Sequence, residues 1–137
     1  MMNNLPLIEI DGAKFNSLEV FYNHFSERAL DTNFWGKNLN AFNDVLRGGF
    51  GTPDGGFKLV WRNHALSKAR LGYKETVLQL EKRLINCHPA NRKYVQEDLD
   101  RAKRGDGPTV YDWLFEIISV HCAGGEESED GIELELS

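Results

Sequence analysis

The chain has 137 residues, of which 41% are hydrophobic and 27% are charged, a balance typical of one globular domain with its own core. No apolar run approaches the roughly 18–20 residues of a membrane span, and the first residues lack a basic segment followed by an apolar one. These features argue against a membrane protein and a secreted one, and they predict a single cytoplasmic domain over residues 1–137.

The net charge of −5 is unevenly distributed along the chain. All sixteen Lys and Arg residues precede residue 111, whereas eight acids and no base follow it. An acidic C-terminal part disfavours nucleic acid and favours a basic partner, although a solvated acidic surface that keeps the protein soluble explains it equally well. The bases within 82–104 alternate with acids and match no nucleic-acid-binding motif, so we do not expect nucleic acid as a partner.

Three short segments alternate apolar and polar residues, as strands with one buried face do: 7–11, 57–62 and 132–136. Helical patterns separate them, and this order predicts a parallel sheet with helical crossovers. Parallel strands covered on both faces are usually apolar throughout. The expected fold is therefore α/β, with a three-stranded parallel sheet, helices mainly on one face and a polar opposite face.

Two helices are predicted between the first two strands. The first begins at Asn16 or Ser17, with Asn16 and Glu19 at the spacing of a capping box. The second covers 38–47, and its inward face consists of Leu39, Phe42, Val45 and Leu46. On its outer side, a continuous polar ridge is formed at positions i, i+3, i+4 and i+7 by Asn40, Asn43, Asp44 and Arg47.

A glycine-rich connector follows, with glycines at 48, 49, 51, 55 and 56. A phosphate-binding loop requires a Lys-Ser/Thr pair at the start of a helix, whereas Phe57 opens a strand. We therefore interpret the segment as a series of turns.

The region after the second strand is predicted to be helical over 65–71, 74–86, 91–104 and 109–122. The breaks between these helices fall at Pro89 and in the cluster 105–108. His121 shares the apolar face of the last helix, so we expect a core or boundary histidine rather than a metal ligand or a catalytic base. Residues 124–130 are predicted to be a flexible acidic linker.

The sequence offers little support for a metal site or for catalysis. Cys87 and Cys122 each adjoin a histidine, but zinc ligands are usually paired two to five residues apart, so we expect two reduced, buried thiols. No nucleophile-elbow, zinc-protease or metal-loop motif occurs, and the four histidines are scattered. We predict no cofactor, no metal and no catalytic residue.

The segment 34–46, FWGKNLNAFNDVL, resembles the barstar family, the intracellular inhibitors of barnase-type ribonucleases. The Trp61-Arg62 end of the second strand, the Ser67-Lys68 pair and the closing strand 132–137 follow in the family's order. The resemblance covers the first 72 residues and roughly 109–137, which leaves 73–108 as an inserted helical segment. It implies a barstar-like fold in which the second helix and the loop before it enter the ribonuclease active site.

The resemblance also implies which residues bind the partner. Asp44 corresponds to the family's helix aspartate and is the expected anchor, and the full candidate set is Trp35, Gly36, Asn38, Asn40, Asn43, Asp44, Arg47 and Glu116. Trp35 is equally compatible with core packing, and Asp44 with an exposed acid paired to Arg47.

The binding segment departs from the family in its charge. Asn40 stands where the family commonly has a second acid, and Asn43 replaces an aromatic residue. The formal charges of 34–56 cancel, which suits a strongly basic cleft poorly. Either other acids contribute, with Glu116 and the loop 126–130 as candidates, or the partner is not a barnase-type enzyme.

We expect a stoichiometric inhibitor that occludes the active site of a ribonuclease, or binds another protein with a basic cleft. The alternative is a binding or scaffolding module of the same fold with a non-nuclease partner, and RNA binding ranks third. The sequence leaves the target, its affinity, the oligomeric state and the role of 73–108 open.

Overall fold

The computed structural model describes residues 5–30, 35–48, 51–53 and 55–137. Loop residues 31–34, which include Phe34 of the barstar-like segment, lie outside the described residues, as do Gly49 and Asp54 of the connector. The elements follow in the order β1 (Leu7–Asp11), α1 (Leu18–Ala29), α2 (Leu39–Arg47), β2 (Lys58–Arg62), α3 (His64–Arg70), α4 (Tyr73–Asn86), α5 (Arg92–Lys103), α6 (Val110–Val120) and β3 (Glu133–Leu136). Single 3-10 turns cover Gly12–Lys14, Pro89–Asn91 and Ser128–Asp130.

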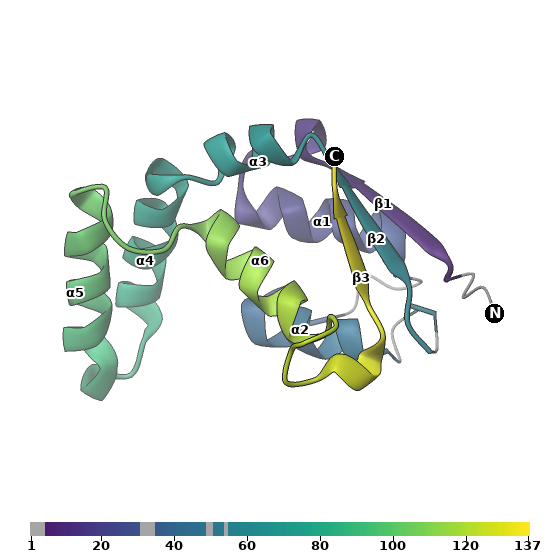
Figure 1. The fold of residues 1–137 in the computed structure, drawn as a ribbon. Helices are drawn as coiled ribbons and strands as arrows, with labels where there is room; N and C mark the ends of the chain where they lie inside the picture. Colours follow the sequence, from purple (N-terminus) through teal and green to yellow (C-terminus); the bar gives the residue numbers. More distant parts are fainter. Residues whose placement is uncertain (1–4, 31–34, 49–50, 54) are drawn as a thin grey trace.

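The three strands form one parallel sheet in the order β1-β2-β3, and the helices gather on one side of it (Figure 1). This confirms the predicted α/β class and parallel sheet. The predicted helices are present with boundaries shifted by one or two residues. Within the described ranges, no helix is long and apolar enough to cross a membrane.

The two faces of the sheet differ as the alternation predicts. Toward the helices, the strands bury Ile10, Leu59 and Trp61. On the outer face, Arg62 donates two hydrogen bonds to the Glu9 carboxylate, at 2.8 and 3.0 Å, and Lys58 pairs with Glu135 at 2.9 Å. Because these ion pairs are solvent-exposed, each contributes at most about 1 kcal/mol, and the buried face accounts for most of the sheet's stability.

Aromatic side chains fill the space between the sheet and the first two helices. Phe42 of α2 meets Phe21 and Phe25 of α1 edge to face, with ring centroids 5.3 and 5.1 Å apart. Trp61 of β2 lies 6.3 Å from Phe21, and its indole N–H donates to Ser67 Oγ at 3.0 Å. This cluster fixes α2 against α1 and the sheet, and thereby fixes the direction in which the polar ridge points.

The start of α1 differs from the predicted capping box. Ser17 is the N-cap, and its hydroxyl accepts the Val20 N–H at 3.2 Å. The predicted capping box between Asn16 and Glu19 is wrong, because the Glu19 carboxylate instead accepts hydrogen bonds from the side chains of Gln79 and Lys82 on α4. The buried carboxylate of Glu75 accepts the free Leu18 N–H at 2.8 Å, so α4 caps α1 from outside.

Helices α4 and α5 form a hairpin beside the main core (Figure 1). Its small separate core consists of Leu80, Leu99 and Ala102, with Tyr73, Val77, Leu84 and Trp113 packed around them. Trp113 of α6 packs against both this core and the main one, and the guanidinium of Arg83 lies over its ring at 5.0 Å.

A histidine beside β1 gives the fold a pH-dependent contribution. His24 Nε2 accepts the Asp11 N–H at 3.0 Å, and burial, aided by nearby Arg28, lowers the pKa of His24 below its usual value. The unfolded chain therefore takes up this proton at a higher pH than the folded protein does. The contribution is complete above the ordinary histidine pKa of about 6.5 and is lost as the pH falls toward the lowered value.

We expect urea denaturation to give a lower free energy of unfolding at about pH 5.5 than at about pH 7.5. His24→Gln should remove part of this difference, because the variant has no imidazole at this position to take up the proton. An unchanged pH dependence in His24→Gln would contradict this role of His24.

Candidate functional site

Helix α2 has well-defined ends that set the position of its side chains. Lys37 adopts a left-handed conformation with φ of 48°, and Asn38 then caps the helix by accepting the Ala41 N–H at 2.8 Å. Gly48, with φ of 114°, ends the helix in a conformation that favours glycine. Of the predicted inward face, Phe42, Val45 and Leu46 are buried and Leu39 is half-buried.

The polar ridge, Asn40, Asn43, Asp44 and Arg47, lies on the opposite side of α2 as predicted. Three of its members are exposed, and Asn43 is half-buried. The Asp44 side chain is 60% exposed and its nearest charged partner is Arg47, at 3.1 Å. The structure thus shows the ion pair with Arg47 that the sequence left open as an alternative role for Asp44. Because most of the Asp44 side chain is exposed, its carboxylate can still contact a partner protein.

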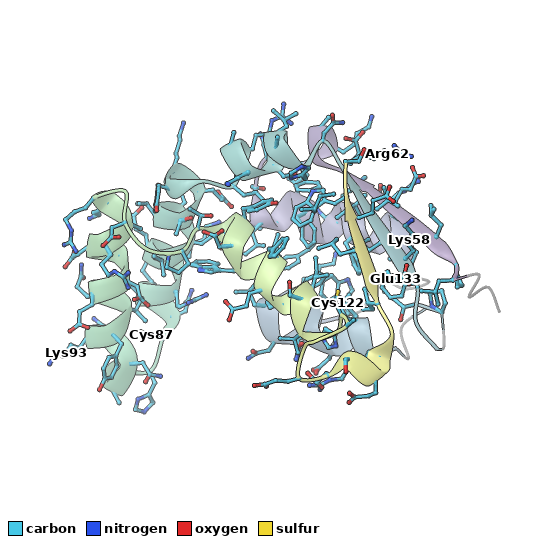
Figure 2. All side chains as sticks on the ribbon, viewed as in Figure 1. Lys58, Arg62, Cys87, Lys93, Cys122 and Glu133 are labelled. Atoms are coloured by element: carbon cyan, nitrogen blue, oxygen red, sulfur yellow. The ribbon has the colours of Figure 1, made fainter. Side chains whose placement is uncertain are left out.

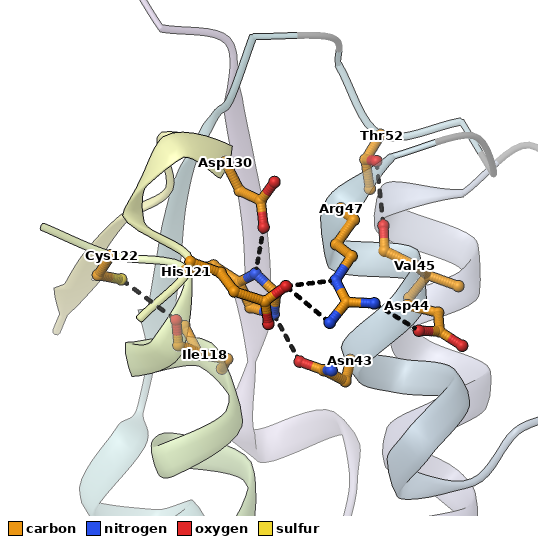
Figure 3. Close-up of polar contacts among 10 residues, drawn as sticks. Asn43, Asp44, Val45, Arg47, Thr52, Ile118, His121, Cys122 and Asp130 are labelled. Carbon is orange, nitrogen blue, oxygen red and sulfur yellow. Dashed lines mark hydrogen bonds and ion pairs between the residues drawn. The ribbon is translucent and has the colours of Figure 1, made fainter. Parts of the chain in front are cut away.

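The acidic loop, residues 126–130, folds against the C-terminal half of the ridge (Figure 3). Arg47 Nε donates to Glu127 Oε1 at 2.7 Å, while its Nη1 donates to Asp44 Oδ1 at 3.1 Å. The hydrogen bond that Arg47 donates lowers the pKa of Glu127, and the same bond raises the pKa of Arg47. The positive charge of the ridge is thus held between two carboxylates.

His121 joins this loop to α2 and α6 (Figure 3). It is fully buried as the C-cap of α6, with Nδ1 2.5 Å from Asp130 Oδ2 and Nε2 2.7 Å from Asn43 Oδ1. This confirms the predicted core histidine. The prediction of a flexible linker at 124–130 is wrong, because hydrogen bonds hold this segment in place. The Glu127 N–H donates to Val120 O at 2.9 Å, and the Asp130 carboxylate is bonded to the His121 imidazole.

Glycine at position 125 is required by the path of this loop. A β-carbon there would lie 2.3 Å from the carbonyl oxygen of Val120, so only glycine permits the close approach. The acidic loop is therefore positioned by its backbone as well as by its side chains.

The groups in this network that could bind a metal ion already have hydrogen-bond or ion-pair partners. His121, Glu127 and Asp130 offer ligand atoms within 4.8 Å of one another. However, the imidazole is already hydrogen-bonded at both nitrogens, and Arg47 bonds to Glu127, so the carboxylates have their charge partners. We assign no metal to these residues.

The two cysteines also differ from the expectation. Both are free thiols, but they are half-buried rather than buried. Cys87 follows α4 and Cys122 follows α6, and Figure 2 shows them well apart, so the two Cys-His pairs do not share one site.

The remaining predicted partner-binding residues lie in different surroundings. Trp35 is 7% exposed, its Nε1–H donates to Ser26 Oγ at 2.6 Å, and its ring meets Tyr22 edge to face. Trp35 therefore packs in the core against α1, the alternative that the sequence left open for it. Gly36 is exposed next to Asn38, and Glu116 is exposed on α6 without an ion pair among the described residues.

A groove of about 680 Å³ opens at the other end of the ridge, between α1, α2 and α4. Asn38 and Asn40 line it together with three cations, Lys37, Lys82 and Arg83, and with one carboxylate, Glu19, which pairs with Lys82. The surface around α2 is therefore acidic at the C-terminal end of the helix, whereas at its N-terminal end three cations outnumber the single carboxylate of Glu19.

The cap of α2 allows a direct test of how this helix is held. Asn38→Ala should lower the free energy of unfolding by about 0.5–2 kcal/mol, because the Ala41 N–H loses its acceptor. Asn38→Asp preserves the acceptor and should stay close to wild type in the same urea titration. Equal stability of the alanine variant would show that the cap contributes nothing.

Comparison with known families adds one finding. The family model described as Barstar (barnase inhibitor) matches residues 5–84, more than half of the chain. The match runs from β1 into α4, so it contains the whole of α2 and its ridge. It also includes the first residues of the segment predicted as an insertion. No curated protein matches the chain.

Proposed function

We propose that this chain, which belongs to the barstar family, is a stoichiometric inhibitor that binds a ribonuclease and covers its active site with the polar ridge of α2. A ribonuclease cleft is basic because it holds phosphates, so carboxylates in matching positions can occupy it. The observation that carries the proposal is the docking of the acidic loop beside the ridge.

This docking supplies the negative charge that α2 alone lacks. Asp44 and the acidic loop together contribute five carboxylates against the one guanidinium of Arg47. Since Glu127 and Asp130 are anchored to Arg47 and His121, part of this charge is already oriented before a partner arrives. Oriented charge of this kind speeds encounter with a basic cleft and costs less ordering on binding.

No step of this function requires chemistry by the chain itself. We place the inhibitor in the cytoplasm, where its thiols would stay reduced, and we assign it no cofactor and no catalytic residue. The segment 73–108 stays, in this proposal, an addition to the barstar-like domain.

The basic groove supports a second candidate, a barstar-like binding module whose partner is not a nuclease. Lys37 and Arg83 at one end of the ridge, which have no ion pair among the described residues, match an acidic surface, which a nuclease cleft does not provide. Such a partner would contact both ends of α2.

Titration into a fluorogenic RNA-cleavage assay with a barnase-type ribonuclease tests the first candidate. We expect activity to fall linearly to an endpoint at one inhibitor per enzyme, and size-exclusion chromatography to show the complex. Unchanged activity together with no complex would contradict inhibition of this enzyme class and favour the second candidate.

A further inference from the structure

The sheet has two outer edges, and they differ in how their backbone groups are satisfied. On β1, the groups that point away from β2 are covered by α1: Arg28 donates to Glu9 O at 2.9 Å, and His24 accepts the Asp11 N–H at 3.0 Å. Side chains thus occupy the edge where another strand would pair.

On the side of β3 that faces away from β2, Ile132 just before the strand is bridged to Cys122, but the edge has no such cover from Leu134 onward. Glu133 and Ser137 donate their N–H groups to Phe57 O and Trp61 O on the β2 side, at 3.0 and 2.9 Å. Because successive residues of a strand alternate in direction, the N–H and C=O groups of Leu134 and Leu136 point away from β2. Among the described residues, none hydrogen-bonds to the backbone of either leucine on that side.

A groove of about 510 Å³ lies beside this edge. It is lined by Phe115 and Ser119 of α6, by Cys122 just after this helix, and by Leu134 and Leu136 of β3. Phe115 and Leu136 are both exposed apolar side chains. A strand added to β3 would direct every second side chain onto the apolar side chains of this groove.

The other side chains of an added strand would lie on the outer face of the sheet, beside Glu133 and Glu135. Glu135 already pairs with Lys58, but Glu133 is exposed and has no ion pair among the described residues (Figure 2 labels Glu133 and Lys58). A basic residue next to Glu133 is therefore favoured. A second copy of β3 would bring its own glutamates against these, and like charges across strands are destabilising.

We propose that β3 is a docking edge for an extended segment of a partner protein in which apolar residues alternate with Lys or Arg. The apolar side chains contact Phe115 and Cys122, the basic ones face Glu133, and the backbone pairs with Leu134 and Leu136. This surface shares no residue with the polar ridge or the acidic loop, so it stands independently of the inhibitor function.

A labelled peptide, Val-Lys-Val-Lys-Val-Lys, titrated against the full chain and followed by fluorescence anisotropy, tests this edge. We expect saturable binding and slower hydrogen exchange at the Leu134 and Leu136 amides. Leu134→Pro should weaken binding about tenfold, because it removes an outward N–H while leaving the bonds to β2 intact. Glu133→Lys should also weaken binding, and a peptide with N-methylated backbone should not bind even to the unaltered protein.

A cationic peptide also meets the acidic loop, and the same variants separate the two sites. Binding that survives both Leu134→Pro and backbone methylation would overturn the proposal, because charge alone would then explain it. Concentration-dependent dimerisation abolished by Leu134→Pro would overturn it as well, since a second copy would then occupy the edge.

Discussion

Replacing Asp44 with alanine is expected to weaken inhibition by about 2–5 kcal/mol, or roughly 30- to 5,000-fold in the inhibition constant. This is the general range for truncating one partner of a buried interfacial charge pair, and pairs from the barstar family are among those that define it. In the free protein Asp44 is 60% exposed, whereas a partner would desolvate it against a cleft cation. Truncation leaves that cation buried and unpaired, and the loss should appear mainly as faster dissociation.

The surroundings of Asp44 make this variant informative, because the fold should tolerate it. Arg47 keeps its bond to Glu127, and exposed ion pairs contribute about 0–1 kcal/mol, so the unfolding free energy should change little. Glu97→Ala, which removes an exposed acid on α5, is the matched control and should inhibit as wild type does. Full inhibition by a folded Asp44→Ala protein would show that the ridge is not the interface.

The largest expected effect on stability is that of Phe42→Ala, about 3–5 kcal/mol in the free energy of unfolding. Phe42 is fully buried and its ring meets two α1 aromatics at 5.1 and 5.3 Å, so truncation leaves a cavity that neighbouring rings cannot close. Urea denaturation measures this directly. A typical domain has about 5–15 kcal/mol of stability, so α2 depends heavily on this one side chain.

Phe42→Leu keeps most of the volume and serves as the comparison, with a smaller expected cost of about 1.5 kcal/mol. A loss below about 1 kcal/mol in the alanine variant would mean that α2 is held by other contacts.

Local patterns in the sequence predicted most of this fold correctly. The three strands follow from two-residue alternation, and the buried and polar sides of α2 follow from helical spacing, because both depend on near neighbours. The capping box of α1 was mispredicted because Glu19 and Leu18 find their partners on α4, some sixty residues away.

The candidate site was predictable only in part, for the same reason. The residues of the ridge lie within one helix, but Arg47 and Glu127 are 80 positions apart and Asn43 and His121 are 78 apart. The acidic stretch was visible in the sequence as a source of charge, yet its attachment to α2 depends on a buried histidine and on the close approach at Gly125. Trp35 was ambiguous because the position of an aromatic residue next to a loop does not reveal whether it faces the core.

The separate core of the α4–α5 hairpin has a consequence for how the molecule opens. The hairpin's core has three buried side chains with four partly buried ones around them, so its amides should exchange with solvent through a local opening that leaves the sheet closed. Because Glu75 on α4 caps α1, opening that includes the first turn of α4 would also loosen α1, whereas opening of α5 alone would not. The hairpin should therefore exchange as two successive units, with α5 first, while α2 remains protected behind Phe42.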